Sequence, residues 1–477
     1  MSARYITTTL PYVNARPHLG HALEFVEADF FVRTLRAKDE EVFFNIGTDE
    51  HGAKIAKKAD EEGRDPQAYV DDYALRFKSF ADQFAISYDS FIRTTDPAHM
   101  RAAQEFWKRC AAAGDIYKAE YEVKYCVGCE LEKTDSELVQ GRCPLHPTLE
   151  IEIRKEENYY FRFSKYRDAL LAHYAAQPDF VVPEGRRREI QAFAQSGFKD
   201  FSISRPREKM SWGVPVPGDA EHIMYVWFDA LVNYISVIGW PADEQLFLKW
   251  WPAIQFAGKD NLRQQTAMWQ AMLLSAGLPL SRQIFIHGFI TSGGQKMSKT
   301  LGNVIDPLVL AERYGVEAVR YVLLRHTSPF EDSDLTQDAI QEHYTAHLTN
   351  GLGNLVARVM KLAEEHLPQP VQLSDEDEKI SDEFFEKVET FRFNEAMDYI
   401  FQKVAAADAF MAERAPYKNV KSGDAALSEM ALRDIEYAVR QLASIAAHLI
   451  GALPRTAAAI TAAVHENRKP DNLFPRL

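Results

Sequence analysis

Residues 1–52 alternate between strand and helix patterns, and this alternation restricts the possible folds more than any other feature of the chain. β-branched residues fill RYITTTLPYVN, which gives way to a proline turn as strands do. Residues 16–40 carry apolar side chains at helical spacing, and Pro17 suits the first helical position. EVFFNIGTDEHG then has the pattern of a second buried strand. Strand, helix and strand in this order build one βαβ unit of a parallel sheet.

The alternation breaks off and returns later in the chain. Residues 57–113 are predicted to be helical, and residues 114–220 hold short strand-like pieces around a cysteine cluster. Strand and helix patterns resume at 223–240 and 256–277, and QIFIHGFIT is a further strand. We therefore predict an α/β fold whose parallel sheet is split by an insertion.

Long amphipathic helices fill the chain from about residue 336 onward, with an acidic linker, LPQPVQLSDEDEK, among them. This pattern predicts an all-α helix bundle. The expected divisions are 1–113 and 221–300 for the two halves of the sheet domain, 114–220 for the insertion, 301–335 for a linking segment and 336–477 for the bundle.

Size and charge limit the class of protein. A chain of 477 residues is too long for one hydrophobic core. A net charge of -14 argues against a protein that coats nucleic acid non-specifically, although a local basic groove is compatible with it. The sequence has neither a signal-peptide pattern nor an apolar run of about 18 residues, and it shows no β-barrel pattern before Leu477. We expect a cytoplasmic monomer with no membrane association.

A first nucleotide-binding motif lies at the first predicted strand-to-helix junction, where His18, Gly20 and His21 stand close together. Doubly wound sheets bind nucleotides at this edge, and a helix N-terminus attracts phosphate. The imidazoles can donate hydrogen bonds to phosphate oxygens, and a glycine leaves room for an adenine. Taken alone, the tetrapeptide HLGH at 18–21 is more often a pair of surface histidines on the first turn of a helix.

A second motif, SGGQKMSKTLGN at 292–303, follows the last predicted strand of the sheet. Lys296 and Lys299 would neutralise charge on a departing pyrophosphate. The two glycines would let the loop close over ATP and reopen. Together the two motifs favour one ATP site, whereas a solvated lysine loop is the alternative.

The pair resembles the HIGH and KMSKS signatures of class I aminoacyl-tRNA synthetases. The strings TTTLPYVNARPHLGH, NIGTDEHG, YVWFDALVNYI, HGFITSGGQKMSKTLGN and LGNLVAR look like the methionyl-tRNA synthetase family in particular. The resemblance covers essentially the whole chain. It implies a Rossmann-like parallel sheet, a zinc-bearing connective insertion and an anticodon-binding helix bundle. It also implies activation of methionine by ATP with Mg2+, followed by transfer to tRNA(Met).

The resemblance assigns roles to individual residues. Catalysis falls on His18, His21, Lys296 and Lys299, and these four contact ATP together with Gly20 and Ser298. The implied methionine pocket consists of Leu10, Tyr12, Asp49, Trp227, Ala230, Leu231, Tyr234 and Gln265. Aromatic and aliphatic side chains suit a thioether, and a carboxylate at position 49 suits an ammonium. Ordinary core packing is the alternative for the apolar members.

The chain departs from the family pattern at several positions. Gln265 stands where the helix after GKD usually has a histidine, and Ala257 stands where a histidine usually precedes GKD. Thr300 replaces the usual serine of the lysine loop. The family tends to stack an anticodon base on a C-terminal tryptophan, but the last tryptophan here is Trp269, so stacking would need a tyrosine or phenylalanine.

Cys126 and Cys129 form a CxxC pair, and Cys143 and His146 form a CxxH pair shortly after it. Four ligands of this type favour a closed, tetrahedral, structural zinc site. Reduced thiols without metal are the alternative. Cys110 lies in a predicted helix and is expected in the core.

Asn354 and Arg358 share one face of the first bundle helix. The resemblance implies that they read anticodon bases, as single-stranded RNA is read through base edges. Without the family, a solvated helix face is the more common explanation. The basic run Arg186, Arg187 and Arg188 is expected to be a solvated helix start rather than a tRNA contact.

Two rival functions remain open at this level: another class I synthetase without an editing domain, and a non-catalytic relative. The 278 residues from His18 to Lys296 are too few for an added editing barrel, which argues against leucine-, isoleucine- and valine-type enzymes. A non-catalytic relative that binds tRNA or methionine is the other alternative, because the histidine and the tryptophan are replaced.

Overall fold

A six-stranded, all-parallel sheet forms the centre of one end of the molecule. The computed structural model describes residues 3–126, 131–133, 138–144, 147–296 and 305–477. The strand order is β3-β2-β1-β11-β12-β7, with β3 at Ser90–Arg93, β2 at Val42–Thr48, β1 at Arg4–Thr8, β11 at Ala253–Gly258, β12 at Gln283–His287 and β7 at Val181–Val182. The predicted parallel sheet is confirmed.

The order of the strands reverses between β1 and β11. From β1 the chain runs outward to β2 and β3 on one side, and from β11 it runs to β12 on the other. Helix α1 (Leu19–Arg36) makes the crossover from β1 to β2. A reversal of this kind leaves a crevice beyond the carboxyl ends of the strands, and ligands of open α/β sheets bind there.

Two sequence-based expectations need correction. The stretch 57–113 is not helical throughout, because β3 interrupts helices α2 (Ala53–Glu61), α3 (Pro66–Gln83) and α4 (Pro97–Ala112). This strand has four residues and only one of them, Ile92, is buried, so it has too little periodicity to stand out. The strand expected near residue 223 is β10 (His222–Met224), but it pairs antiparallel with β9 (Ser204–Pro206), outside the main sheet.

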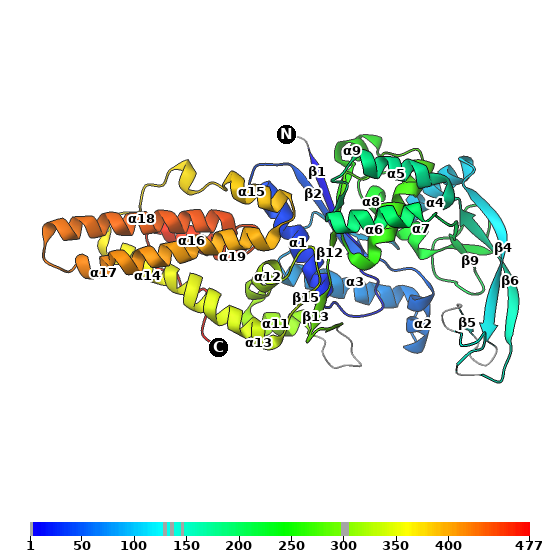
Figure 1. Ribbon diagram of the computed structural model, residues 1–477, viewed down its shortest axis with the longest axis horizontal. Coiled ribbons are helices and arrows are strands. Elements are labelled where there is room, and N and C mark those ends of the chain that lie inside the picture. The colour runs from blue at the N-terminus through cyan, green and yellow to red at the C-terminus, as the bar shows by residue number, and fades with distance from the viewer. Residues whose placement is uncertain (1–2, 127–130, 134–137, 145–146, 297–304) are drawn as a thin grey trace.

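Residues 114–220 contain a long antiparallel pair, β4 (Ile116–Cys126) and β6 (Ile151–Phe161), which projects from the end of the molecule opposite the bundle (Figure 1). Short strands β5 (Leu131–Lys133) and β8 (Phe201–Ser202) flank the pair. The same stretch also supplies helices α5 (Arg167–Ala176) and α6 (Glu184–Gln195) and the edge strand β7 of the main sheet. Part of the predicted insertion is therefore built into the sheet.

The second half of the sheet domain contains short helices α7 to α10 around the crevice: α7 (Val226–Ala230), α8 (Asn233–Ser236), α9 (Glu244–Trp250), the π-helical turn η4 (Gln264–Met268) and α10 (Trp269–Ser275). A small sheet follows, made of β13 (Ile290–Ser292), β14 (Gln295–Lys296) and β15 (Ser333–Asp334). Helices α11 (Pro307–Tyr314) and α12 (Val316–Arg325) then lead toward the bundle.

Within 336–477 the structure contains helices and no strand, as predicted. The long axis of the molecule runs from the sheet to this bundle (Figure 1). Its elements are α13 (Gln337–His343), the π-helical η6 (Tyr344–Gly353), α14 (Asn354–His366), α15 (Asp382–Glu389), α16 (Phe393–Arg414), α17 (Pro416–Asn419), α18 (Ala425–Leu449) and α19 (Pro454–Glu466).

One apolar core runs from the sheet into the bundle without a break. It includes Phe256 of β11, Phe30 of α1 and Leu442 of α18, all buried. Phe391, just before α16, stacks on Phe285 of β12 with ring centroids 4.6 Å apart and an interplanar angle of 5°. Each Å2 of apolar surface removed from water stabilises the fold by about 25 cal/mol, so a shared core holds the sheet and the bundle together strongly. The bundle and the sheet therefore stabilise each other.

A buried ion pair fixes this junction. Arg320 of α12 donates through Nη2 to Asp29 Oδ2 of α1 at 2.7 Å, and both side chains are fully buried. The guanidinium also donates to the carbonyls of Ala452, Gly451 and Phe84 at 2.8, 2.9 and 3.1 Å. Burial alone would raise the pKa of Asp29, but Arg320, Arg33 and hydrogen bonds from Ser87 lower it below its usual value.

We expect Arg320→Met or Asp29→Asn to lower the free energy of unfolding by about 3–5 kcal/mol, because the first leaves the buried Asp29 with only the partly exposed Arg33 as charge partner and the second leaves the buried Arg320 without its carboxylate. The measurement is urea unfolding at pH 7, with Arg188→Met as control, since Arg188 forms only an exposed pair with Glu184. The folded-state pKa of Asp29 is depressed, so the wild-type advantage is present above pH 4 or so and fades as the pH falls further. A loss no larger than that of the control would contradict this assignment.

Candidate active site

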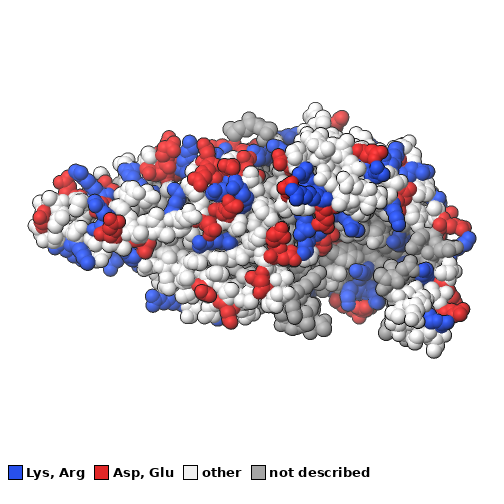
Figure 2. Space-filling view, in the orientation of Figure 1, with Lys and Arg blue, Asp and Glu red and all other residues white. Residues whose placement is uncertain are grey.

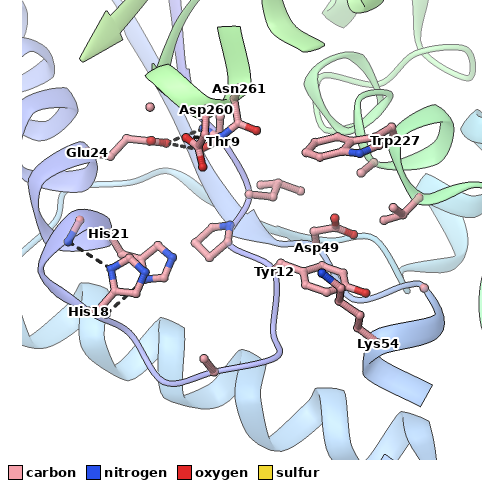
Figure 3. A pocket seen from close by; sticks show the side chains of 18 of the residues that line it. Thr9, Tyr12, His18, His21, Glu24, Asp49, Lys54, Trp227, Asp260 and Asn261 are labelled. Carbon is pink, nitrogen blue, oxygen red and sulfur yellow. Dashed lines mark hydrogen bonds between the residues drawn. The ribbon is translucent and has the colours of Figure 1, made fainter. Parts of the chain in front are cut away.

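A cavity of about 970 Å3 opens beyond the carboxyl ends of β1, β2, β11 and β12. Figure 3 shows side chains from both halves of the sheet domain converging on it. Its lining includes every predicted ATP- and methionine-site residue whose side chain the structure describes: Leu10, Tyr12, His18, Gly20, His21, Asp49, Trp227, Ala230, Leu231, Tyr234 and Gln265. Segments more than 200 residues apart in sequence thus meet around one space, and Ile290 and Asp306, on either side of the lysine loop, are among the lining residues.

The two histidines form a rigid pair at the start of α1. His18 is the N-cap, and its Nδ1 accepts from the backbone N–H of Gly20 at 3.1 Å. His21 Nδ1 accepts from the backbone N–H of His18 at 3.2 Å, and the two rings stack with centroids 3.7 Å apart (Figure 3). Since both Nδ1 atoms accept, each neutral ring carries its proton on Nε2. The pair therefore presents N–H donors beside a helix N-terminus, where phosphate is favoured.

The protonation state of His21 suits donation without added charge. Burial, reinforced by the neighbouring His18, lowers the pKa of His21 well below its usual value. At position 20, a Cβ would lie 3.1 Å from Cε1 of the His18 ring, so glycine permits the stack. A side chain there would press on the ring that caps the helix.

Asp49 lies just after β2, where its backbone N–H donates to the carbonyl of Pro11 at 2.9 Å and its carbonyl accepts from Val13 at 3.1 Å. Its carboxylate is almost fully buried, and Oδ1 has no hydrogen-bond partner within the described chain. Burial, with the negative charge of Asp229 close by, raises the pKa of Asp49 well above its usual value. A buried carboxylate in this condition favours a cation from the ligand.

Tyr12 lies beside Asp49, through a parallel β-bridge between the two residues (Figure 3). Its position depends on Gly52, because a Cβ at residue 52 would lie 2.8 Å from the Tyr12 hydroxyl. Gly52 also has a φ of 115°, which side-chain-bearing residues rarely adopt. The turn after β2 therefore holds both the carboxylate and the ring at the cavity.

An apolar slot lies across the cavity, with a polar floor. Trp227, Ala230 and Leu231 come from α7 and the turn after it. Tyr234 is buried, and its hydroxyl accepts from Gln265 Nε2 at 2.8 Å. Because the amide occupies a lone pair of the phenol oxygen, the phenol proton is directed away from Gln265. The slot thus combines apolar walls with one oriented hydroxyl.

A network of buried amides holds Gln265 in place. Gln255 Nε2 lies 3.4 Å from Gln265 Oε1, and Gln270 Nε2 donates to the Gln265 carbonyl at 2.8 Å. Ser281 completes the network by donating to Gln255 Oε1 at 2.6 Å and accepting from Gln270 Nε2 at 3.0 Å. Ala257, in contrast, is buried in β11 and does not line the cavity. Gln265, which stands where the family usually has a histidine, is therefore held by neighbouring side chains that form a hydrogen-bond network with it.

An ion pair that the sequence did not reveal connects the two halves of the site. Glu24 Oε2 lies 3.0 Å from His287 Nε2, while Glu24 Oε1 accepts from the N–H and hydroxyl of Thr9 at 2.7 and 2.5 Å. Burial opposes the charge on His287, but the hydrogen bond and charge of Glu24, with Glu27, raise its pKa to about 9. His287 lies at the end of a strand, in the predicted strand segment QIFIHGFIT. This position at a strand end is the sequence feature that could have identified it as a site residue.

The lysine loop is described only as far as its entrance. Gly294 N–H donates to Asp334 Oδ1 at 2.8 Å, and Thr291 pairs with Lys296 between β13 and β14. The structure does not describe Ser298, Lys299, Thr300 or the side chain of Lys296. The preceding strand β13 contributes Ile290 to the cavity wall, so the loop starts from the rim of the site.

The predicted zinc ligands are described in part. Cys126 ends β4, and Cys126 and Cys143 are both about 1% exposed. Among the described residues of 139–150, Cys143 is the only buried one. A buried thiol in a segment whose other described residues are exposed fits a cysteine that binds a structural metal ion. Cys129 and His146 lie outside the described residues.

Cys110 is a core residue of α4, as expected, and burial raises the pKa of its thiol to about 12.

The predicted anticodon pair lies on the bundle. Asn354 begins α14 and is exposed, and Arg358 Nη1 donates to Asp408 Oδ1 at 2.8 Å. Arg186, Arg187 and Arg188 form ion pairs with glutamates of α6, which agrees with a solvated helix start. Figure 2 shows basic and acidic side chains interspersed over the visible face, in keeping with a protein that does not coat nucleic acid.

Comparisons with known proteins agree with this geometry. The family model described as tRNA synthetases class I (M) matches residues 4–150 and 146–360. The chain is 40% identical over 463 residues to the methionine–tRNA ligase of Thermosynechococcus vestitus, covering 93% of this chain and 86% of that protein. It is 41% identical over 455 residues to the Mesorhizobium japonicum methionine–tRNA ligase, covering 92% and 87%.

Solved structures show the same similarity. The Mycobacterium tuberculosis methionyl-tRNA synthetase in complex with methionyl-adenylate superposes with a TM-score of 0.87 at 35% identity, covering 100% of this chain and 99% of that chain. The free-state structure of the M. tuberculosis protein gives a TM-score of 0.81 at 33% identity, covering 100% and 98%.

The raised pKa of Asp49 predicts pH-dependent binding of the expected ligand, methionine. Pairing with the ammonium requires the ionised carboxylate, so affinity falls as the pH falls, starting above the usual aspartate range. Isothermal titration calorimetry with methionine at pH 5–8 would measure the affinity. Asp49→Asn is expected to weaken binding at pH 8 by about tenfold to hundredfold and to flatten the profile. A flat wild-type profile would contradict this role.

Proposed function

This chain belongs to the methionyl-tRNA synthetase family of class I enzymes, and from that premise we propose how its residues activate methionine and charge tRNA(Met). In the first step the methionine carboxylate attacks the α-phosphorus of ATP, and pyrophosphate leaves. In the second, a ribose hydroxyl at the 3′ end of tRNA takes the methionyl group from the adenylate, and AMP leaves. The observation that carries the proposal is the shared cavity, with imidazole donors on one side and an unpaired carboxylate on the other.

Asp49 and the apolar slot bind the amino acid. The methionine ammonium pairs with the buried Asp49 carboxylate. It supplies a positive partner for Oδ1, which has no hydrogen bond among the described residues. The thioether lies between Trp227 and Tyr234, where aromatic rings favour sulfur. Tyr234, held by Gln265, directs its hydroxyl toward the sulfur. The substrate carboxylate is then left facing the nucleotide side of the cavity.

His18 and His21 bind the phosphates of ATP through their Nε2–H groups, and Gly20 leaves space for the adenine. Neutral donors fixed before the reaction need no reorganisation when charge develops. No general base is required, because the attacking carboxylate is already a nucleophile, and positioning supplies the rate.

Lys296, Ser298 and Lys299 complete the proposed nucleotide site from the loop that starts at the cavity rim. Lysines there would neutralise the leaving pyrophosphate, together with Mg2+ that enters with ATP. The anchoring of Gly294 by Asp334 supports a loop hinged at this point.

The connective hairpin and the bundle have proposed roles outside the cavity. Cys126, Cys129, Cys143 and His146 would hold one structural Zn2+, which the burial of the two described thiols supports. Asn354 and Arg358 would read anticodon bases from α14, with Arg358 exchanging Asp408 for a base. A monomeric state and a cytoplasmic location stay predictions of the sequence. Within the described residues no helix is long and apolar enough to span a membrane.

The function is tested by ATP–pyrophosphate exchange across a panel of amino acids. We expect exchange with methionine and not with leucine. His21→Asn should lower kcat about 10²–10³-fold, as removal of a preorganised donor does, and His465→Asn, on the exposed surface of α19, should leave it unchanged. Exchange with a different amino acid, or none, would overturn the proposal and favour a non-catalytic relative.

The amide network predicts a separable effect on methionine. Gln265→Leu removes the donor that orients Tyr234 and leaves Gln255 Nε2 without its partner. We expect the KM for methionine to rise about tenfold, close to the cost of one lost hydrogen bond, while the KM for ATP stays constant. Equal changes in both constants in steady-state exchange assays would point to general misfolding instead.

A further inference from the structure

Three histidines meet where α12 joins the bundle. His326 is the C-cap of α12, His343 ends α13, and His347 lies four residues later in η6. One ring nitrogen of each lies within 4.8 Å of those of the other two. In the part of the chain that the structure describes, no other group of three or more histidines, cysteines or acidic residues meets this distance. None of the three belongs to the cavity or to the predicted zinc knuckle.

We propose that His326, His343 and His347 bind one divalent transition-metal ion of the zinc class. A set of three imidazoles, without thiolate or carboxylate, suits Zn2+, Cu2+, Ni2+ or Co2+ and excludes Mg2+ and Ca2+, which prefer oxygen. Histidines at i and i+4 on one helix are a recurring pair of ligands. The third ligand comes from another element, and three protein ligands leave a position for water.

One phenol hydroxyl contacts two of the three rings. The Tyr321 hydroxyl lies 2.7 Å from His347 Nδ1 and 3.0 Å from His326 Nε2. The other nitrogen of each of these two rings lies outside these hydrogen bonds, so it is the ligand atom in the proposed site, with the phenol as the outer partner of both rings. Arg325 donates to the same hydroxyl at 2.9 Å and to Asp398 Oδ1 at 2.8 Å, so its positive charge is balanced close by.

The rings are in the form that binds metal. Burial, aided by the neighbouring His343 and Arg325, lowers the pKa of His326 to about 3. Burial likewise lowers the pKa of His343 and of His347. Neutral imidazoles offer a lone pair without prior loss of a proton.

Metal binding requires at least one ring to rotate, because all three rings are nearly parallel: the plane of His347 lies within 10° of that of His326 and 13° of that of His343. His326 lies face to face with His343, with ring centroids 3.5 Å apart and an interplanar angle of 3°. Parallel rings cannot both direct in-plane lone pairs at one ion, so one must turn about its side-chain bonds. His343 is half-buried, and no hydrogen bond within the described chain holds its ring, so it is the one that turns. The bound ion would then link α12, which leads from the sheet domain, to α13 and η6 of the bundle.

Titration of the metal-free, full-length protein with Co2+ separates this site from the predicted knuckle, because thiolate ligands give intense charge-transfer bands that an imidazole site lacks. We expect wild type to bind one equivalent without thiolate character. His343→Gln should lose it, and His347→Gln provides a second test should the first variant fold poorly. His465→Gln, a histidine paired with Glu378 outside the cluster, is the matched control and should keep it.

Thermal unfolding with Zn2+ alone gives an independent readout. Zn2+ should raise Tm more in wild type and His465→Gln than in His343→Gln and His347→Gln, since only the folded cluster binds the ion. Equal Co2+ stoichiometry and equal Tm shifts in wild type and both cluster variants would overturn the proposal. So would a wild type whose bound Co2+ is all thiolate-ligated.

Discussion

The ion pair between Asp29 and Arg320 determines how the bundle is placed on the sheet. Apolar contacts across this junction are extensive but non-directional, and alone they would tolerate sliding. Charged hydrogen bonds are directional, and the Arg320 guanidinium uses them to join α1, α12, the end of α3 and the turn between α18 and α19. Helix α1 is common to this junction and to the cavity, because its first turn carries the histidine pair. A shift at the junction would therefore move the His18–His21 pair, the proposed phosphate donors.

Charge within the cavity is divided in a way that, under the proposed function, would set the orientation of a zwitterionic substrate. The nucleotide side has a helix N-terminus with neutral N–H donors, and the cationic His287 there is already paired with Glu24. The other side has the buried carboxylate of Asp49, whose Oδ1 has no hydrogen-bond partner among the described residues. An amino acid can satisfy both sides only with its ammonium toward Asp49 and its carboxylate toward the phosphates. The reacting oxygen is thereby directed by electrostatics before any loop closes.

Most of the fold followed from periodicity, and most of the cavity followed from motif order. The sheet, the interruption after α4 and the helical C-terminal region all have patterns long enough to recognise, whereas β3 and β7 have four and two residues and carry none. His18 and Asp49 follow strand ends, which pattern analysis can locate, whereas Trp227, Tyr234 and the other members of the implied methionine pocket were assigned through the resemblance to the synthetase family. Glu24, His287 and the Gln255–Gln270–Ser281 network were missed because such pairings depend on three-dimensional placement of side chains that look like ordinary core or helix residues. The histidine cluster was missed for the same reason, since His326 is 17 residues before His343.

The pairing of β7 with β12 has a consequence for how this architecture can be altered. Val181 and Val182 come from between the two halves of the sheet, yet they cover the outer edge of β12. A chimera that exchanged 114–220 between relatives would transplant an edge strand along with the projecting hairpin, and a poor match would leave β12 open to pairing with another chain. Grafting the β4–β6 hairpin alone spares that edge. The recombination points that preserve folding therefore lie at the base of the hairpin.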